Sequence, residues 1–303
     1  MLPIKLWKLF FLMIKLKPLV VHTWLYHANL IGGSIAKLLN IKKIYWSIHH
    51  DFEYSSFFKM IEMKLLIIFS YFIPNKIIYC SYISKINHIK NGYSKNYSEI
   101  IENGISTSQY KPNKLYRNQI RRKLKISKDC FVIGNISRYH YLKDHDNLLK
   151  ALNIFNKYNS NFKCILVGNG LSIDNLDLIK KINKYSLSNK IILFGQSFEV
   201  NKIINCFDLN ILSSIKECSP MVLMESMSSG VPCLSTDVGD AKKIIGETGW
   251  VVVPSDPVSL GKKLIKIATK KNILQKKSQK VRRRIIQKYS IEKMIKDYKS
   301  LYL

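Results

Sequence analysis

Two glutamates flank the expected start of a short helix in the second half of the chain. Glu217 lies a few residues before the helical pattern, and Glu225 lies inside it. Ser219 followed by Pro220 is the favoured order of an N-cap serine and a proline at the first helical position. We therefore predict a helix over residues 221–229, ended by the glycine that comes next.

The N-terminus of this helix is suited to an anion or to sugar hydroxyls. The N–H groups of the first helical residues have no partner within the helix, and they lie at the positive end of its dipole. The backbone from Cys218 to Val222 would supply such groups. A carboxylate on either side could accept hydrogen bonds from the hydroxyls of a nucleotide sugar. On residue types alone, an alternative stays open in which neither glutamate binds a ligand. One would then be favoured by the helix dipole, and the other would be solvated.

Basic residues and histidines also stand at the ends of predicted strands. Arg138 follows one strand, and Lys143 opens the helix after it. His49 and His50 end another strand. Ligands of parallel sheets bind at the carboxyl ends of the strands, so these residues are candidates for a site. Histidine exchanges protons near neutral pH. On residue type alone, each could equally be solvated or structural.

The triplet Asp144-His145-Asp146 has the Asp-x-Asp pattern with which metal-dependent transferases hold a divalent ion on a diphosphate. Here it falls in the predicted first turn of a helix, where aspartate is favoured by the helix dipole. We therefore predict that the protein uses no metal and no cofactor.

Short β-rich runs alternate with longer helical patterns along most of the chain. Such alternation predicts right-handed βαβ units and parallel sheets, and the near-continuous apolar runs fit strands that are covered on both faces. A turn at Asn103-Gly104 and a polar stretch over residues 106–114 interrupt the alternation. We expect an α/β protein with two Rossmann-like domains joined near residues 104–114. The predicted strands are 19–24, 43–48, 76–80, 98–101, 130–136, 162–167, 190–194, 209–213, 231–235 and 250–253.

The charge balance of the chain is strongly basic. Lys and Arg number 49 against 20 Asp and Glu, which gives a net charge of +29. A basic surface attracts nucleic acid, anionic lipid or acidic small molecules, but a general preference for lysine would produce the same total. Residues 261–284 carry eleven Lys and Arg and no acidic residue. The chain lacks the aromatic and basic motifs of common nucleic-acid-binding modules, so we predict no nucleic-acid partner.

The cysteines and the apolar segments bear on the cellular compartment. The six cysteines form no Cys-x-x-Cys pair, which excludes a zinc ribbon or a thioredoxin-like motif and fits a reducing compartment. Residues 1–24 are apolar but carry four lysines, and the apolar run 65–73 is too short to span a bilayer. No signal-peptide cleavage site follows the first segment. We expect a cytoplasmic protein, either fully solvated or peripheral on the inner face of the cytoplasmic membrane.

Several segments together resemble the family 4 retaining glycosyltransferases, which have the two-domain GT-B fold. Glu217 and Glu225, followed by SMSSGVPCLSTDVGD and GETGWVVVPSDP, resemble the donor-binding segment of that family. IIENGISTSQYKP resembles its interdomain turn, and VIGNISRYHYLKDHDNLLKAL resembles the strand, loop and helix that bind the donor diphosphate. HTWLYHANLIGGSIAKLLN and IYWSIHHD resemble elements of its acceptor domain. The resemblance covers nearly the whole chain.

The resemblance implies a role for each matching residue. Glu217 would contact the hydroxyls of the donor sugar, and Glu225 would bind the ribose diol. Arg138 and Lys143 would neutralise the diphosphate and the charge that develops on the leaving group. His49 matches a histidine that faces the donor sugar and acceptor, which implies an orienting role. The implied catalytic residues are Glu217, His49, Arg138 and Lys143. The implied donor-binding residues are Arg138, Lys143, Ser197 and Glu199 of the base-contacting loop, Glu217, Cys218, Ser219, Pro220, Met221, Val222 and Glu225.

The resemblance also implies a division of the chain. Residues 1–104 match an acceptor-side domain, residues 105–289 a nucleotide-sugar donor-binding domain, and residues 290–303 a C-terminal helix that packs back toward the first domain. The family's opening strand and glycine-rich loop have no counterpart, so we expect a truncated first domain. Cys218 and Ser219 replace the apolar residues that are common after the first glutamate. That replacement leaves the identity of the donor sugar open.

The implied activity is transfer of a hexose from a nucleotide-diphosphate sugar to a lipid-linked or saccharide acceptor, with retention of configuration. The implied setting is the synthesis of a bacterial surface polysaccharide such as capsule or lipopolysaccharide. One alternative is a non-catalytic donor-binding remnant or partner subunit of a glycosyltransferase. Another is a nucleotide-sugar epimerase, because the fold alone does not separate these functions.

Overall fold

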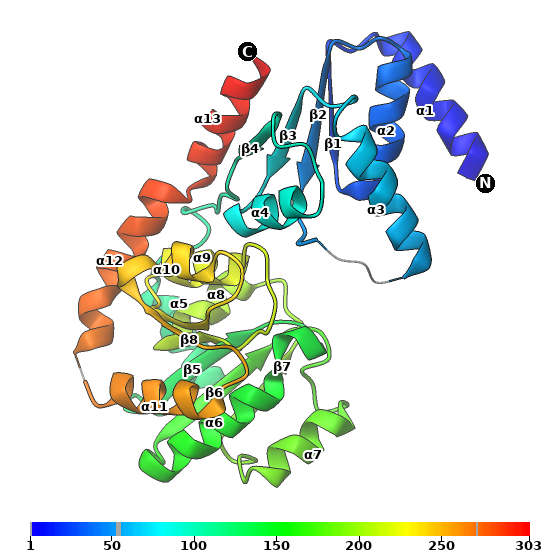
Figure 1. Cartoon of the computed structure of the whole chain (residues 1–303). Helices are drawn as coiled ribbons and strands as arrows, with labels where there is room; N and C mark the ends of the chain where they lie inside the picture. Colours follow the sequence, from blue (N-terminus) through cyan, green and yellow to red (C-terminus); the bar gives the residue numbers. More distant parts are fainter. Residues whose placement is uncertain (1, 53–55, 271) are drawn as a thin grey trace. The chain divides into compact units, whose positions relative to one another are not determined.

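The chain forms two compact units, each built on one parallel β-sheet (Figure 1). The computed structural model describes residues 2–52, 56–270 and 272–303. The first unit comprises Met1–Asn103 and Met294–Leu303, and the second comprises Gly104–Lys293. The expected α/β class with two parallel sheets is confirmed.

The first unit contains a four-stranded sheet in the order β1-β2-β3-β4. Helices α2 and α3 cover one face, where an apolar cluster forms around the fully buried Trp46. Helix α13 covers the other face: Leu301 packs beside Tyr45, and the Tyr45 hydroxyl donates to the Leu301 carbonyl at 3.2 Å. The elements are α1 (Leu2–Leu16), β1 (Val20–Trp24), α2 (Tyr26–Leu38), β2 (Lys43–Ile48), α3 (Phe57–Phe69), β3 (Lys76–Tyr79), α4 (Tyr82–Lys90), β4 (Ser98–Ile100) and α13 (Ile291–Tyr302).

The second unit contains a six-stranded sheet in the order β10-β9-β8-β5-β6-β7. Chain order runs outward from the centre of the sheet in both directions, so the order reverses between β5 and β8. The elements are α5 (Lys114–Lys123), β5 (Phe131–Ile136), η1 (Tyr141–Lys143), α6 (His145–Tyr158), β6 (Phe162–Val167), α7 (Leu176–Lys184), β7 (Ile191–Gly195), α8 (Val200–Ile203), η2 (Ile204–Cys206), β8 (Leu209–Leu212), α9 (Met221–Ser228), β9 (Cys233–Thr236), α10 (Ala241–Ile245), η3 (Gly246–Thr248), β10 (Trp250–Val252), α11 (Pro257–Ala268) and α12 (Ile273–Lys288).

All ten strands predicted from the sequence are present, with ends that differ by at most two residues. The largest difference is at β9, which begins at Cys233 rather than Val231. Pro232 explains the late start, because proline has no N–H to donate to a strand ladder. Within the parts of the chain that the structure describes, no helix is long and apolar enough to cross a membrane.

Candidate active site

Most of the predicted site residues lie in the loops that follow β5 and β8. Arg138 and Lys143 come after β5, and Glu217 comes after β8. The two strands are parallel neighbours, so their carboxyl ends lie at the same edge of the sheet. A crevice for ligands is expected where the strand order of an open α/β sheet reverses, as it does between these two strands.

Three contacts join these two loops. The backbone N–H of Ile215 donates to the carbonyl of Leu142 at 2.9 Å, and the Ser213 hydroxyl donates to the carbonyl of Lys143 at 2.9 Å. The Lys143 ammonium lies 2.5 Å from Oε1 of Glu217. The structure therefore brings together two predicted site residues that are 74 positions apart in the chain.

The carboxylate of Glu217 is positioned from two sides. Its Oε1 accepts hydrogen bonds from Lys143 and from the Ser214 hydroxyl, the latter at 2.7 Å. The hydroxyl of Thr236, at the end of β9, donates to the carbonyl of Ser214 at 2.6 Å and fixes this loop. Both bonds of the carboxylate are to Oε1 and no described residue hydrogen-bonds Oε2, so Oε2 can accept from a ligand. Sequence reasoning did not find Ser214, because nothing in the local pattern marks it.

Arg138 is exposed, and its side chain has no hydrogen bond or ion pair with any other residue that the structure describes. Its backbone is held against the loop after β6, where the Tyr139 N–H donates to the Asn169 carbonyl at 2.7 Å. Gly168 makes this approach possible: its φ is +146°, and a Cβ there would lie 1.9 Å from the Ser137 carbonyl oxygen. The guanidinium is thus available to an anionic ligand.

Gly239 lies against the backbone of the Glu217 loop. Its φ is +53°, and a Cβ at this position would lie 2.5 Å from the Cys218 carbonyl oxygen and 2.6 Å from that of Glu217. The Asp240 N–H donates to the Cys218 carbonyl at 3.0 Å. A glycine just behind the end of a strand was the signal in the sequence that could have identified this role.

The helix after Glu217 differs in two details from the prediction. It spans Met221–Ser228, and its N-cap is Pro220 in an extended conformation rather than Ser219. The prediction placed Pro220 inside the helix and counted it among the residues that supply N–H groups, which was wrong because proline has none. Met221 and Val222 begin the helix, so their N–H groups have no partner within it. The predicted glycine end is confirmed, since Gly230 follows the last turn with a φ of +76°.

Glu225 lies within α9 and is hydrogen-bonded to the hydroxyl of Tyr110. Burial raises the pKa of the Glu225 carboxyl, and the hydrogen bond from Tyr110 partly opposes that rise. Burial and the neighbouring Glu225 raise the pKa of Tyr110. The segment of Tyr110 is itself fixed, because its carbonyl accepts from the Ser228 hydroxyl at 2.6 Å and from Arg282 at 3.0 Å. Sequence reasoning did not find Tyr110, which is far from Glu225 in the chain.

Three predicted residues belong to other segments than the loops that carry Lys143 and Glu217. Ser197 and Glu199 follow β7, at the edge of the sheet; the Ser197 hydroxyl accepts from the Glu199 N–H at 3.1 Å, and Glu199 pairs with Lys202. His49 belongs to the first unit, where its ring stacks on Trp24 with centroids 4.8 Å apart. Burial, followed by the neighbouring His50, lowers the pKa of His49.

Both carboxylates of the Asp-x-Asp triplet have partners within the protein. Asp144 caps α6 by accepting from the Asn147 N–H at 3.1 Å, and Asp146 pairs with Lys150 at 2.6 Å. They line a pocket of about 370 Å³ with Tyr139, His140, Tyr141, His145, Asp177 and Lys181.

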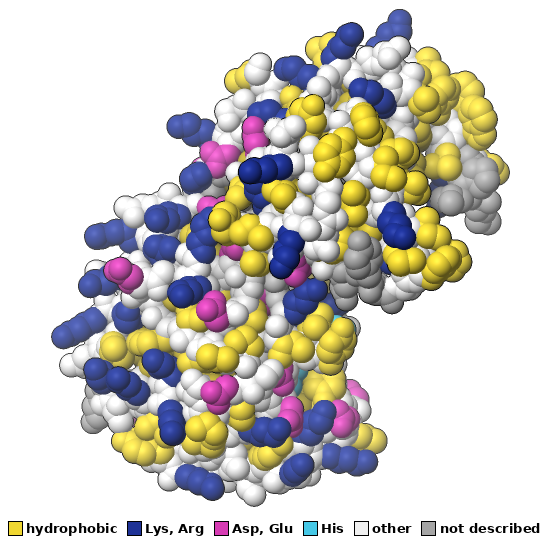
Figure 2. Space-filling model, in the orientation of Figure 1, with side chains coloured by type: hydrophobic (Ala, Val, Ile, Leu, Met, Phe, Trp, Pro, Cys, Tyr) yellow, Lys and Arg dark blue, Asp and Glu magenta, His cyan; other side chains and the backbone are white. Residues whose placement is uncertain are grey.

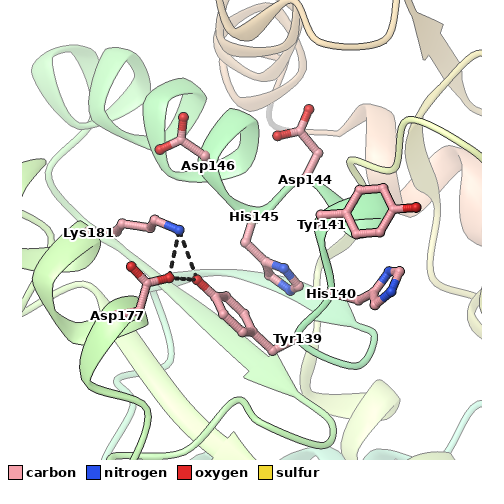
Figure 3. A pocket seen from close by; sticks show the side chains of 8 residues that line it. All are labelled: Tyr139, His140, Tyr141, Asp144, His145, Asp146, Asp177 and Lys181. Atoms are coloured by element: carbon pink, nitrogen blue, oxygen red, sulfur yellow. Dashed lines mark hydrogen bonds and ion pairs between the residues drawn. The ribbon is translucent and has the colours of Figure 1, made fainter.

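Figure 3 shows Tyr139 and Lys181 turned toward Asp177, while Asp144 and Asp146 lie apart from this cluster. Among the described residues, no group of three or more His, Cys, Asp or Glu is arranged to hold a metal ion.

Comparison with solved structures shows the fold. The Anabaena protein HepE, in a crystal structure with UDP, superimposes with a TM-score of 0.88 at 17% sequence identity. The match covers 98% of this chain and 81% of that protein. The expected GT-B fold class is thereby confirmed.

Comparison with curated sequences finds distant relatives. The N-acetyl-alpha-D-glucosaminyl L-malate synthase of Bacillus anthracis is 24% identical over 188 residues, 61% of this chain and 48% of the relative. An Escherichia coli UDP-Gal:alpha-D-GlcNAc-diphosphoundecaprenol alpha-1,3-galactosyltransferase is 22% identical over 292 residues, 94% of this chain and 75% of the relative. The chain spans about half the length of several curated relatives that it matches, between 42% and 52%.

The second unit carries the family assignment. A sequence profile described as "Glycosyl transferases group 1" matches residues 116–288, which include the loops after β5 and β8 and the whole of α9. The match extends over more than half of the chain, and it shows that this protein belongs to the glycosyl transferases group 1 family.

Proposed function

We propose that this protein transfers a hexose from a nucleoside-diphosphate sugar to an acceptor hydroxyl, with retention of configuration. One observation carries the proposal: Glu217 and Lys143 are in contact at the reversal point of the sheet, with the unpaired Arg138 on the same loop as Lys143. Two cations at the carboxyl ends of the strands suit a diphosphate, and a carboxylate with one open oxygen suits sugar hydroxyls.

In this proposal, each residue binds a different part of the donor. Arg138 and Lys143 bind the diphosphate and stabilise the charge that grows on it as the glycosidic bond breaks. Glu217 holds the hydroxyls of the sugar, and Glu225 accepts hydrogen bonds from the ribose diol. The acceptor oxygen bonds to the anomeric carbon on the face that the diphosphate leaves. The acceptor proton passes to the departing phosphate oxygen. The orienting role that the resemblance implies for His49, in the first unit, stays a prediction.

Nucleotide binding is the first test of this function. The solved structure with a similar fold contains UDP, so UDP and UDP-sugars are the first ligands to try, with GDP and ADP as comparisons. Calorimetry on the full chain should detect binding of one of them, and Arg138→Ala should weaken it without changing thermal unfolding. If all three nucleotides fail to bind at millimolar concentration, the proposal is wrong.

The acceptor is proposed to be lipid-linked, with the protein working at the inner face of the cytoplasmic membrane in surface polysaccharide synthesis. Support comes from the Escherichia coli relative, whose name gives a diphosphoundecaprenol-linked sugar as its acceptor and which matches along 94% of this chain. Incubation with a labelled nucleotide sugar and undecaprenyl-linked acceptors should move label into the lipid extract. NMR of the product should show the anomeric configuration of the donor. An inverted product would refute retention, and nucleotide binding without transfer to any acceptor would identify a donor-binding subunit instead.

A further inference from the structure

A pocket of about 370 Å³ lies between the loop after β5 and helices α6 and α7 of the second unit (Figure 3). This loop also carries Arg138 and Lys143, but neither of them is among the described residues that line the pocket. Glu217 and Glu225 are not among them either. The volume falls in the range of about 300–1,000 Å³ that is usual for small-molecule sites, so the pocket is a candidate for a second ligand.

Tyr139, Asp177 and Lys181 form a connected polar cluster on one side of this pocket. The Tyr139 hydroxyl donates to Oδ2 of Asp177 at 2.5 Å, and the Lys181 ammonium donates to the same oxygen at 2.7 Å and to the hydroxyl at 3.0 Å. These hydrogen bonds lower the pKa of the Asp177 carboxyl, so it is ionised at neutral pH. An ammonium has three N–H donors, and no described residue hydrogen-bonds Oδ1 of Asp177. A charged donor and a charged acceptor are therefore open next to each other.

His145 adds a buried acceptor to the wall of the pocket. Its ring is 3% exposed and packs beside that of Tyr139, with centroids 5.2 Å apart. Burial, followed by the charge of Lys143, lowers the pKa of His145 to about 4, so the ring is neutral at neutral pH. The Ser137 hydroxyl donates to Asn135 at 3.3 Å, so its oxygen accepts from Nε2–H of His145 at 3.1 Å. Nδ1 then carries a lone pair and has no partner among the described residues, which favours a ligand with O–H or N–H donors.

Tyr141 provides an aromatic face on the other side of the pocket. The residue is 70% exposed, and its ring packs beside that of His140 with centroids 4.5 Å apart. Figure 3 shows Tyr141 across the pocket from the cluster of Tyr139, Asp177 and Lys181. An exposed aromatic ring of this kind suits the apolar C–H face of a sugar ring.

The charges around the pocket favour a neutral ligand. Figure 2 shows acidic side chains close together on the side of the second unit where α6 and α7 lie, on a surface whose other charged groups are mostly Lys and Arg. Asp146 pairs with Lys150 at 2.6 Å, and Asp177 pairs with Lys181 at 2.7 Å. The carboxylates disfavour an anion such as phosphate, and their pairing with lysines leaves little net charge to attract a cation. A ligand with many hydroxyl groups and no charge fits this combination.

We propose that this pocket binds a neutral saccharide through one of its hexopyranose rings. Neighbouring hydroxyls of the sugar would donate to Asp177 and accept from Lys181, and its C–H face would pack on Tyr141. The inference goes beyond the proposed function, because it adds a saccharide site outside the residues that bind the donor in that proposal. The site can be tested without any transfer reaction.

Saturation-transfer NMR on the full chain detects small molecules that contact the protein. The neutral probes are methyl α-D-glucopyranoside, methyl α-D-galactopyranoside and N-acetylglucosamine, and spermidine is the cationic probe. We expect at least one neutral sugar to receive saturation and spermidine to receive none. A titration then gives the dissociation constant of that sugar.

Two matched double variants locate the bound sugar. The pocket variant is Tyr141→Ser/Asp177→Ala. Its control is Tyr158→Ser/Asp174→Ala, which removes the same two kinds of side chain from exposed positions that do not line the pocket. We expect the control to bind the sugar as wild type does and the pocket variant to lose about tenfold or more in affinity, because it lacks a charged acceptor and an aromatic face. Glu217→Ala should retain the binding.

A second measurement does not depend on the pocket variant. His140 lines the pocket, whereas His27 is an exposed histidine of the first unit. The ring signals of both are assigned by their loss in His140→Gln and His27→Gln. In the Glu217→Ala protein, the sugar should shift the signals of His140 and leave those of His27 in place.

Other results would overturn the proposal. Absence of saturation transfer to all three sugars would remove the proposed ligand, and spermidine binding that the sugars do not displace would make the pocket a cation site. Equal losses in the two double variants, or unmoved His140 signals, would place the sugar elsewhere. Loss of binding in Glu217→Ala alone would assign the sugar to the proposed donor site.

Thermal unfolding checks that each variant folds, and UDP calorimetry reports on the proposed donor site separately. Sugar binding to the pocket without nucleotide binding would refute the proposed function and leave the pocket proposal standing. Nucleotide binding without sugar binding would do the reverse.

Discussion

Replacing Gly239 with alanine tests whether this glycine sets the position of the Glu217 carboxylate. The new Cβ would lie 2.5 Å from the Cys218 carbonyl oxygen and 2.6 Å from that of Glu217, whereas ordinary contacts begin at 3.4 Å. Both obstructing atoms are backbone, so the loop must move by about 0.9 Å (3.4 minus 2.5). Positive φ adds a conformational cost of about 1–2 kcal/mol for a residue with a side chain.

A shift of this size should affect catalysis more than stability. Misplacement of a reacting group by about 1 Å can lower a rate on the order of a hundredfold. We therefore expect Gly239→Ala to reduce transfer about a hundredfold and to remove most of the preference for the nucleotide sugar over the free nucleotide. Affinity for the free nucleotide should change little, because Glu225 and Arg138 bind that part of the donor in the proposal. Steady-state kinetics and calorimetry measure the two effects.

Gly92→Ala is the matched control. Gly92, in the first unit, also has a positive φ, +104°, but its Cβ would meet only the side chain of Ile67, with methyl carbons at 3.2 and 3.9 Å. The control should show the conformational cost in urea unfolding and leave transfer unchanged. If Gly239→Ala retains transfer within about threefold of wild type, or if Gly92→Ala loses as much activity, the reasoning from backbone contact is refuted.

Four further predictions concern Glu217, Glu225 and the ion pair of Asp208 with Arg121. Glu225→Ala should weaken nucleotide binding in calorimetry, whereas Glu217→Ala should chiefly slow transfer, because only contacts that strengthen in the transition state raise the rate; equal effects would contradict this division. The raised pKa of Glu225 implies that nucleotide affinity falls as the pH is lowered through that pKa, and Tyr110→Phe should move the midpoint to higher pH. A carboxyl whose pKa is raised by folding stabilises the fold at a pH below its pKa in the unfolded chain, and this contribution is lost as the pH rises through its pKa in the folded protein. Glu225→Gln, which stays uncharged, should therefore raise the unfolding temperature at neutral pH. Asp208→Asn should lower the free energy of unfolding by about 3 kcal/mol in urea titrations, because it leaves the buried Arg121 guanidinium without its carboxylate at 2.7 Å; a change near zero would refute the importance of this pair.

The sequence alone was sufficient to predict the strands and the type of fold. Apolar runs of strand length, broken by Gly, Pro and Asn, are local signals, and they located all ten strands within two residues. The same kind of signal predicted the glycine after α9, because only a residue that tolerates a φ of +76° ends a helix in this way. Arg138 was selected because it follows a predicted strand and Glu217 because it precedes a predicted helix, which are also local properties, and the family resemblance supplied their roles.

The arrangement of the site required the tertiary structure. No local pattern states that β5 and β8 are neighbours, and that pairing alone brings Lys143 to Glu217. The contact of Tyr110 with Glu225 and the support of the Glu217 loop by Gly239 likewise join residues that the chain separates. The N-cap is Pro220, in an extended conformation and without a side-chain cap hydrogen bond, whereas local propensity favoured Ser219.

The exposed apolar face of α1 is another feature that the sequence alone could not predict. The sequence gives no sign of which apolar residues of this helix will be buried, because Met13 and Trp7 are equally suited to a core. Packing against the first unit buries only one face and leaves Trp7 and Phe11 in solvent. Local sequence determined where each helix and strand forms because backbone preferences and hydrophobic periodicity act over a few residues. Which of their faces meet was decided by the burial of apolar surface over the whole unit, since contacts between distant segments depend on how all of them pack together.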